Sequence, residues 1–298
     1  MVLSTDYLNS NPIAIEFKIG TYKDLGRLLV AANLSDLCGT GAKPIGFLAS
    51  IMLDKKTSKK ADFIELMRGI KKELSIHSIP LIGGDTKLGN SNSFCGVALG
   101  MREVNTKLFF KNGAKPDDII WVSGKIGSVA AAIDGLRDNL MSKEWEKWAI
   151  RKITSPIIPL EMSRQLSKTK KINAGTDLSD GLGADLFSLC KASNVGAVIN
   201  ALDIPISKQV REIAKQKKIE PWKYAFTIGG DFQFIVTAKV GVDLDKFGLK
   251  KIGFITKDTS LNLKVKEAFI SLPQKGHRDF KIIDFKNEVS ILLNTIHT

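Results

Sequence analysis

The sequence lacks the features that mark several large classes of protein. Its three cysteines, Cys38, Cys95 and Cys190, are widely separated and form no CxxC pair, so they do not supply the four clustered ligands of a structural zinc site. No run of about 18 apolar residues occurs, which argues against a membrane-spanning helix. The first residues also lack the basic region and the long apolar stretch of a signal peptide. We therefore expect reduced thiols, a cytoplasmic location and no membrane partner.

Two common nucleotide and nucleic-acid signatures are missing as well. There is no GxxxxGK[ST] segment, so a P-loop enzyme is not predicted. The formal net charge of +13 is compatible with nucleic-acid binding, but lysines such as Lys55, Lys56, Lys217 and Lys218 are spread along the chain with few aromatic residues between them. We interpret most of them as solvated helix surfaces and predict no nucleic-acid partner. Part of this charge can attract an anionic nucleotide or phosphate ester.

What is present is a chain of 298 residues, 44% hydrophobic, which is long enough for two medium-sized cores. Apolar residues recur at helical spacing and predict helices over 24–40, over 59–75 with Ser58 as the cap, and over 181–192. A strand over 79–82 is expected to lead into a loop at Gly83-Gly84-Asp85-Thr86. This alternation of strands and helices indicates a mixed α/β fold.

The chain is predicted to divide into two mixed α/β domains. A polar stretch containing glycine and proline, Asn112-Gly113-Ala114-Lys115-Pro116-Asp117-Asp118, precedes an apolar strand and indicates the boundary. We therefore expect an N-terminal domain over 1–113 and a C-terminal domain over 114–298.

Aspartates beside small or hydroxyl residues at segment junctions are the most informative feature. They occur in Ser4-Thr5-Asp6, Asn33-Leu34-Ser35-Asp36, Gly83-Gly84-Asp85-Thr86 and Thr176-Asp177-Leu178-Ser179-Asp180-Gly181. Carboxylates at strand ends can bring oxygen ligands to one point, and Mg²⁺ takes a few such ligands together with substrate phosphates. Each aspartate is also explained as a turn former or a helix cap, and Asp180 directly precedes a predicted helix. Spacing alone leaves both interpretations open.

These segments resemble motifs of thiamine-monophosphate kinase, in the superfamily that includes aminoimidazole ribonucleotide synthase. Six segments are similar to motifs of that family. They are the Ser4-Thr5-Asp6 strand end, Ala32–Leu37 followed by Gly41-Ala42-Lys43-Pro44, Ile82–Thr86, Thr176–Asp185, Gly229-Gly230-Asp231-Phe232-Gln233 and Gly276–Phe280. The match over Thr176–Asp185 is the most specific. The resemblance runs in order through nearly the whole chain.

The resemblance implies a two-domain α/β protein that dimerises by pairing its N-terminal sheets and binds ATP in a cleft. It implies transfer of the γ-phosphoryl group of ATP to thiamine monophosphate, with Mg²⁺ as cofactor. By motif, the metal ligands are Asp6, Asp36, Asp85, Asp177 and Asp180, assisted by Thr5, with Asp36 and Asp180 as catalytic residues. Gly84, Asp85 and Ser179 are the implied nucleotide contacts, and Asp231 and His277 the implied substrate contacts.

The sequence departs from the family pattern at positions that concern the substrate and part of the metal site. The family's Gly-Asp-Asp-Ala motif is not in this sequence, so either the sequence starts downstream of it or part of the metal site is missing. Its Gly-Val-His-Phe segment corresponds to Asn9–Phe17, which has no histidine, and one acidic residue is missing beside Asp231. Two alternatives therefore stay open: an ATP-dependent enzyme of the same superfamily with another acceptor, or a catalytically weak nucleotide-binding paralogue.

Overall fold

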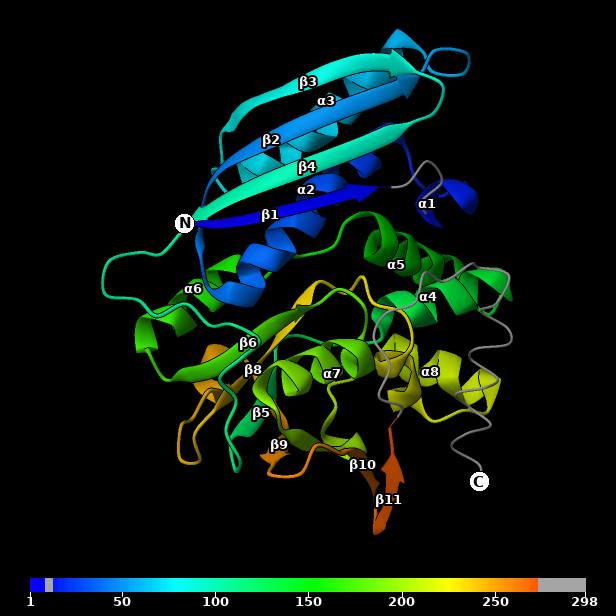
Figure 1. Cartoon of the computed structure of the whole chain (residues 1–298). Coiled ribbons are helices and arrows are strands. Elements are labelled where there is room, and N and C mark those ends of the chain that lie inside the picture. The colour runs from blue at the N-terminus through cyan, green and yellow to red at the C-terminus, as the bar shows by residue number, and fades with distance from the viewer. Residues whose placement is uncertain (9–12, 273–298) are drawn as a thin grey trace.

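The computed structural model describes residues 1–8 and 13–272 and forms two β-sheets, in the upper and lower parts of Figure 1. The upper sheet has the order β1-β4-β2-β3, and the lower sheet the order β11-β10-β7-β9-β5-β8-β6. The upper strands are β1 (Val2–Leu8), β2 (Lys43–Asp54), β3 (Leu81–Gly89) and β4 (Ser93–Met101). The lower strands are β5 (Ile119–Val122), β6 (Ile172–Leu178), β7 (Gly196–Asn200), β8 (Gln233–Ala238), β9 (Lys250–Thr256), β10 (Leu261–Val265) and β11 (Ala268–Ser271). The predicted mixed α/β class is confirmed.

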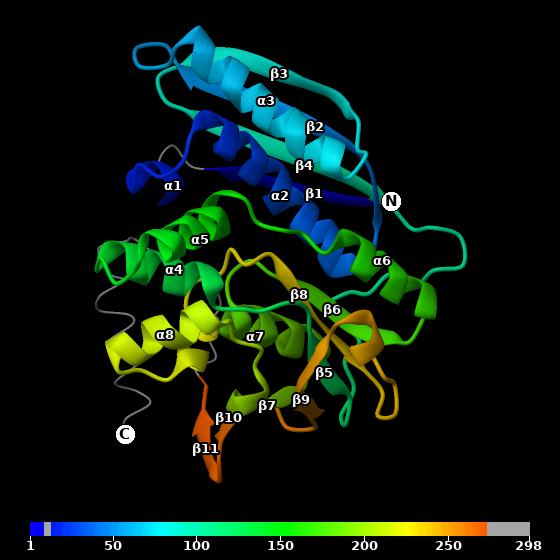
Figure 2. The ribbon, with the colours of Figure 1, turned by 180° about the vertical axis from the view of Figure 1, so that it is seen from behind.

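One face of the four-stranded sheet is covered by α2 (Tyr22–Thr40) and α3 (Lys60–Ile76), which lie in front of it in Figure 2. Thr21 and Asp24 form a capping box at the start of α2, and Gly41, with φ of 72°, ends it in the left-handed conformation. β2 and β3 are parallel, with α3 as the crossover, whereas the other pairs in this sheet are antiparallel. The short helix α1 (Ile13–Glu16) lies beyond the end of β1.

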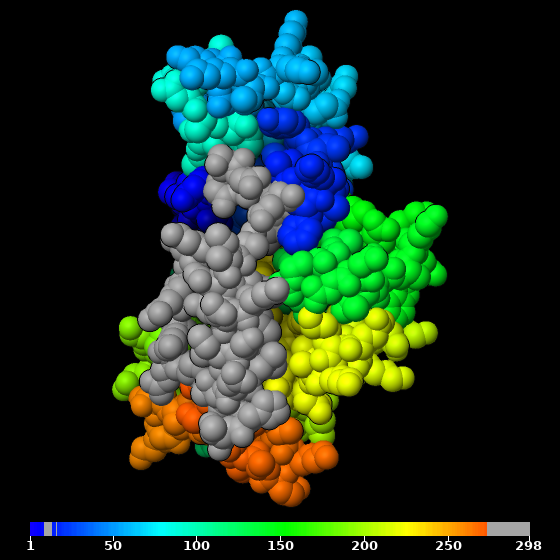
Figure 3. All heavy atoms as spheres, turned by 90° about the vertical axis from the view of Figure 1, so that its right-hand side faces the viewer, coloured from blue at the N-terminus to red at the C-terminus, as the bar shows by residue number. Residues whose placement is uncertain are grey.

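The remaining helices lie in the chain between strands of the seven-stranded sheet. They are α4 (Ser128–Arg137), α5 (Lys143–Thr154), α6 (Leu160–Thr169), α7 (Leu182–Ser193) and α8 (Lys208–Lys217), with 3₁₀ turns η1 (Ala201–Asp203), η2 (Pro221–Phe226) and η3 (Asp245–Phe247). Figure 3 shows the region of α4 and α5, in green, beside α8, in yellow. In the part of the chain that the structure describes, no helix combines the length and apolar character needed to cross a membrane.

Helix α2 also joins the two halves of the molecule. The buried cluster around it combines Leu37 of α2 with Phe109, which follows the first sheet, and Phe234 of β8. At Gly39 the helix approaches β6 so closely that a Cβ there would lie 2.5 Å from the backbone nitrogen of Asp177. The stretch 112–118, where the boundary is predicted, lies between β4 and β5. The domain limits themselves stay a prediction.

Two local expectations are wrong. Helix α3 is preceded by Lys59 as its N-cap, whose backbone N–H donates to Asp62, while the Ser58 hydroxyl donates to Asn92. The segment Gly83-Gly84-Asp85-Thr86 does not form a loop but lies inside β3. Gly84 is needed there for close packing, because a Cβ would come within 2.0 Å of the Ala49 carbonyl oxygen of β2.

Candidate active site

Strand β1 and helix α2 bring the first two predicted carboxylates together. Side chains alternate along a strand, so Ser4 and Asp6 share one face of β1. The Ser4 hydroxyl donates a short hydrogen bond to Asp36 of α2, and the carboxyls of Asp6 and Asp36 hydrogen-bond to each other. Buried Asn33, one helical turn before Asp36, accepts a 3.0 Å hydrogen bond from the Asp6 backbone N–H and thereby ties the strand to the helix.

The end of β6 brings the third carboxylate to the same place. Asp177 is buried, and the Ser35 hydroxyl of α2 donates a 2.7 Å hydrogen bond to it. The absence of a side chain at Gly39 permits this approach of α2 to β6. Polar residues from opposite halves of the molecule therefore meet at their junction.

The turn after β6 carries Asp180, and its geometry argues against the capping interpretation of that residue. The N-cap of α7 is Gly181, with φ of 97°, and no side chain caps the helix there. The Asp180 backbone N–H instead donates to the carboxylate of Asp185 at 3.0 Å. Asp185, in the first turn of α7, is a site residue to which sequence reasoning assigned no role.

Burial, reinforced by neighbouring negative charges, raises the pKa values of several carboxyls at this site. Loss of surrounding water, together with the charges of Asp36 and Asp180, raises the pKa of Asp6 to about 6. Burial and the charge of Asp36 raise the pKa of Asp177 to about 7, although the hydrogen bond from Ser35 acts in the opposite direction. Burial, followed by the charges of Asp177 and Asp180, raises the pKa of Asp185 to about 8. Burial also raises the pKa of Asp36.

A lysine that the motifs did not single out balances this negative charge. Lys111 is exposed and lies close enough to lower the pKa values of Asp36, Asp177 and Asp185 by its charge. Its backbone is held in place, because its carbonyl accepts a 2.8 Å hydrogen bond from Ser193 of α7. A cation beside a carboxylate cluster is well suited to bind an anionic group brought there with a metal ion.

The donor set fits a magnesium ion that is shared with phosphates. Within 1–8 and 13–272, no group of three His, Cys, Asp or Glu side chains is arranged to hold a metal ion by itself. Mg²⁺ seldom uses an all-protein cage and commonly takes one or two carboxylates, waters and phosphate oxygens. Carboxyls whose pKa values are raised by burial and by neighbouring negative charges are groups that a divalent cation stabilises in the charged form.

Three other predicted residues lie apart from this cluster. Asp85 is on β3, at the opposite edge of the sheet from β1, which standard strand spacing puts about 14 Å away. It is exposed and paired with Lys87 at 3.1 Å, and this contact lowers its pKa. Gly84 precedes it on β3. The Thr5 hydroxyl, on the face of β1 opposite Asp6, donates to the Gly96 carbonyl at 3.2 Å.

The remaining predicted contacts fall into two groups. Ser179 is exposed beside Asp180, and its carbonyl accepts a hydrogen bond from Gly230 at 3.1 Å. Asp231 instead turns toward the start of α4, where both of its carboxylate oxygens accept backbone hydrogen bonds. His277 lies outside the described residues.

Known proteins resemble this chain in sequence. A family model described as AIR synthase related protein, N-terminal domain, matches residues 1–101. A thiamine-monophosphate kinase from Buchnera aphidicola subsp. Acyrthosiphon pisum is 32% identical over 271 residues, which are 87% of this chain and 81% of that protein.

Solved structures agree in fold. The crystal structure of thiamine-monophosphate kinase from Stenotrophomonas maltophilia K279a has a TM-score of 0.78 at 26% identity, covering 90% of this chain and 86% of that one. The structure of AaThiL complexed with AMPPCP and TMP also has a TM-score of 0.78, at 21% identity, with 90% and 86% coverage. At that identity the second match is a likeness of fold.

Proposed function

We infer that this chain, which belongs to the thiamine-monophosphate kinase family, uses ATP to phosphorylate thiamine monophosphate. The γ-phosphoryl group of ATP passes to a phosphate oxygen of thiamine monophosphate, and the products are thiamine diphosphate and ADP. The P–O bond to the β-phosphate breaks as the bond to the acceptor phosphate forms. The observation that supports this most directly is the convergence of Asp6, Asp36, Asp177 and Asp180 from three separate motifs at one junction.

The residues of the site fit a reaction that depends on positioning and charge. The acceptor phosphate is already an anion, so no strong general base is needed, and phosphoryl transfer is catalysed mainly by orientation and electrostatic stabilisation. Lys111 is a cation placed to contact a phosphate, because its charge already acts on Asp36 and Asp177. In this proposal Ser179, exposed beside Asp180, contacts the nucleotide.

We propose magnesium as the metal, held by Asp6, Asp36, Asp177 and Asp180. When bound, it would supply charge neutralisation of the phosphates. The oxygen donors of these four residues support this assignment, and so do the raised pKa values of Asp6, Asp36 and Asp177. The roles that the motifs imply for Thr5, Gly84 and Asp85 lie outside this cluster, because Thr5 turns to the other face of β1 and Asp85 pairs with Lys87 on β3.

We also propose a homodimer in which the N-terminal sheets pair. Figure 1 shows the face of the four-stranded sheet that α2 and α3 do not cover. Large side chains are exposed on its two edge strands: Leu3 is 64% and Tyr7 70% exposed on β1, and Leu88 is 72% exposed on β3. Apolar groups of this size at a sheet face and edge are typical of a buried interface.

The free thiols of Cys38, Cys95 and Cys190 support a reducing location such as the cytoplasm.

The proposed reaction is tested with purified protein, ATP, magnesium and thiamine monophosphate, and thiamine diphosphate is measured directly. We expect product formation that depends on the metal and is largely lost in Asp180→Asn, because an amide cannot supply the same charge to a cation. A folded protein that binds ATP but forms no thiamine diphosphate would contradict the assigned acceptor. Metal dependence that is unchanged in Asp180→Asn would contradict the role of Asp180.

A further inference from the structure

Residues 224–231, here called the bracing segment, run from η2 to β8 and are held at both ends by helix α4. The first attachment is Asp231. Its Oδ2 accepts a 2.6 Å hydrogen bond from the Gly127 N–H, and its Oδ1 accepts bonds from Ser128 and Val129 at 3.1 and 3.2 Å. The N–H groups at a helix N-terminus lack partners within the helix, and a carboxylate satisfies them while meeting the positive end of the helix dipole.

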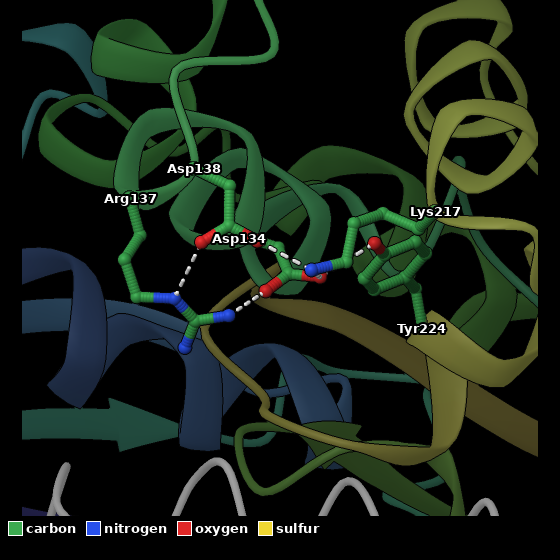
Figure 4. A network of polar contacts seen from close by, with 5 residues as sticks. All are labelled: Asp134, Arg137, Asp138, Lys217 and Tyr224. Carbon is green, nitrogen blue, oxygen red and sulfur yellow. Dashed lines mark hydrogen bonds and ion pairs between the residues drawn. The ribbon is translucent and has the colours of Figure 1, made fainter.

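The second attachment is Tyr224, whose hydroxyl donates a 2.7 Å hydrogen bond to Asp134 in the second half of α4. Asp134 is buried and is held in turn by Arg137 and by Lys217 of α8, as Figure 4 shows. The contact between segment and helix is also tight at the backbone. A Cβ at Gly127 would lie 2.8 Å from the Ala225 nitrogen.

Between these two attachments the bracing segment lies directly against the turn that carries Ser179 and Asp180. The Gly230 N–H donates to the Ser179 carbonyl at 3.1 Å. Gly229 is so close that a Cβ there would lie 1.7 Å from the same oxygen, and a Cβ at Gly181 would lie 3.0 Å from the Thr227 oxygen. The turn therefore has backbone of the bracing segment packed against it on one side.

We propose that Asp231 and the Tyr224–Asp134 pair are positioning residues, which hold the bracing segment against the Ser179–Asp180 turn and so fix the place of the Asp180 carboxylate. Both oxygens of Asp231 are already engaged with α4, so this role differs from the substrate contact that its motif implies. The consequence for magnesium and nucleotide binding rests on the proposed function. The consequence for the turn itself does not.

The test uses three substitutions in the full-length chain. Asp231→Asn replaces one accepting oxygen by an NH₂ group that cannot accept, and Tyr224→Phe removes only the hydroxyl that reaches Asp134. The matched control is Asp138→Asn, because Asp138 belongs to the same network through Arg137 and Lys217 but forms no hydrogen bond with the bracing segment among the residues that the structure describes. Thermal melting is measured for each protein to establish that it is folded.

Hydrogen exchange without ligand is the first measurement. We expect exchange at the amides of Asp180 and Gly230 to become about tenfold faster in Asp231→Asn and Tyr224→Phe, because loss of an anchor makes local opening easier. Exchange in β2 and β4 should not change, whereas a general loss of stability would accelerate both regions. Unchanged exchange at Asp180 and Gly230 in the two folded variants, or equal acceleration everywhere, would overturn the proposal.

The magnesium concentration that half-saturates ATP binding is the second measurement. It should rise several-fold in Asp231→Asn and Tyr224→Phe and stay at the wild-type value in Asp138→Asn. Faster local exchange with an unchanged magnesium requirement would show that the bracing segment does not position the Asp180 carboxylate for metal binding. That result would overturn the part of the proposal that concerns magnesium and nucleotide binding. If the wild-type protein bound no ATP with magnesium, the proposed function would fail, and the exchange results would still decide whether the segment braces the turn.

Discussion

The Ser35 hydroxyl donates a 2.7 Å hydrogen bond to the Asp177 carboxylate, and this contact joins residues 142 positions apart in the chain. Ser35 lies on the helix that covers the four-stranded sheet, and Asp177 ends a strand of the seven-stranded sheet. The bond favours the charged form of a carboxyl whose pKa is otherwise raised by burial. It therefore links the junction of the two halves to the charge state of the proposed metal site.

Removal of this bond in Ser35→Ala is expected to lower the free energy of unfolding by about 1–3 kcal/mol, because a buried acceptor loses a partner. The pKa of Asp177 should rise further, so magnesium-dependent ATP binding should move to higher pH. Denaturant unfolding and ATP binding across a pH series measure the two effects. In the control Ser167→Ala, which removes a buried hydroxyl bonded to the Lys107 carbonyl, only stability should change. An equal shift of the pH profile of ATP binding in both variants would contradict the role of the Ser35 hydroxyl in setting the pKa of Asp177.

The close approach of α2 to β6 gives a second prediction. Gly39→Ala places a Cβ 2.5 Å from the Asp177 nitrogen, so either the helix or the strand must move. We expect a loss of about 1–3 kcal/mol in the free energy of unfolding, which is the usual cost of overpacking, together with weaker magnesium-dependent ATP binding.

Gly183→Ala is the matched control for that substitution. Gly183 lies in helix α7, where a Cβ would meet a Phe226 ring carbon at 3.4 Å, an ordinary contact. Alanine has the higher helix propensity, so this variant should be unchanged or more stable by up to about 1 kcal/mol. Equal stability of Gly39→Ala and wild type would show that the junction is less tightly packed than the distance implies.

Lys111 supports a third prediction, about the nucleotide. Lys111→Met removes the cation beside Asp36 and Asp177 and should weaken ATP binding about tenfold, which corresponds to about 1.4 kcal/mol. The wild-type affinity should fall with added salt, and this dependence should be smaller in the variant. Calorimetric or fluorescence titration at two salt concentrations measures both quantities. Lys115→Met, four residues further along the same segment, is the control, and an equal loss in both variants would indicate only general electrostatic attraction.

Local elements could be predicted from the sequence where apolar spacing and caps agree. The helix predicted over 24–40 is observed as Tyr22–Thr40, because its buried stripe and its terminal glycine indicate most of its length and its end, whereas the Thr21–Asp24 capping box places its start two residues earlier. The loop predicted at Gly83–Thr86 is wrong for a physical reason. Gly84 serves close packing of β3 on β2, and the sequence does not distinguish this use of glycine from a turn.

The site could be predicted only as far as its motifs extend. Asp6 and Asp36 come together as the motif series implies, yet Asp85 lies on the far edge of the same sheet, because the strand order β1-β4-β2-β3 separates segments that look equivalent in sequence. Asp231 contacts Gly127, which is 104 positions away, so no local pattern indicates its helix-capping position. One sequence signal could have identified Asp185 as a site residue. An acidic residue in the first turn of a helix often accepts a hydrogen bond from the backbone just before the helix, as Asp185 does from Asp180.

The raised pKa values predict how stability depends on pH when no metal is bound. The pKa values of Asp6, Asp177 and Asp185 are about 6, 7 and 8, well above those of an unfolded chain. The folded protein therefore keeps protons that the unfolded chain has released. The resulting stability is complete below the unfolded pKa and is lost as the pH rises through the folded values. Between about pH 5 and about pH 8.5, the melting temperature should fall.

Magnesium with ATP should reverse this trend, because a metal ion binds the deprotonated carboxylates and stabilises the folded state most at high pH. Melting curves across that pH range, with and without magnesium and ATP, measure the effect. Asp185→Asn provides the control: it removes the acid with the highest pKa but keeps an oxygen that can accept from the Asp180 N–H, so the fall in melting temperature above about pH 7 should become shallower. A melting temperature of the metal-free wild type that rises steadily with pH would contradict a carboxylate cluster that repels itself, and with it the electrostatic reason for a cation at this site.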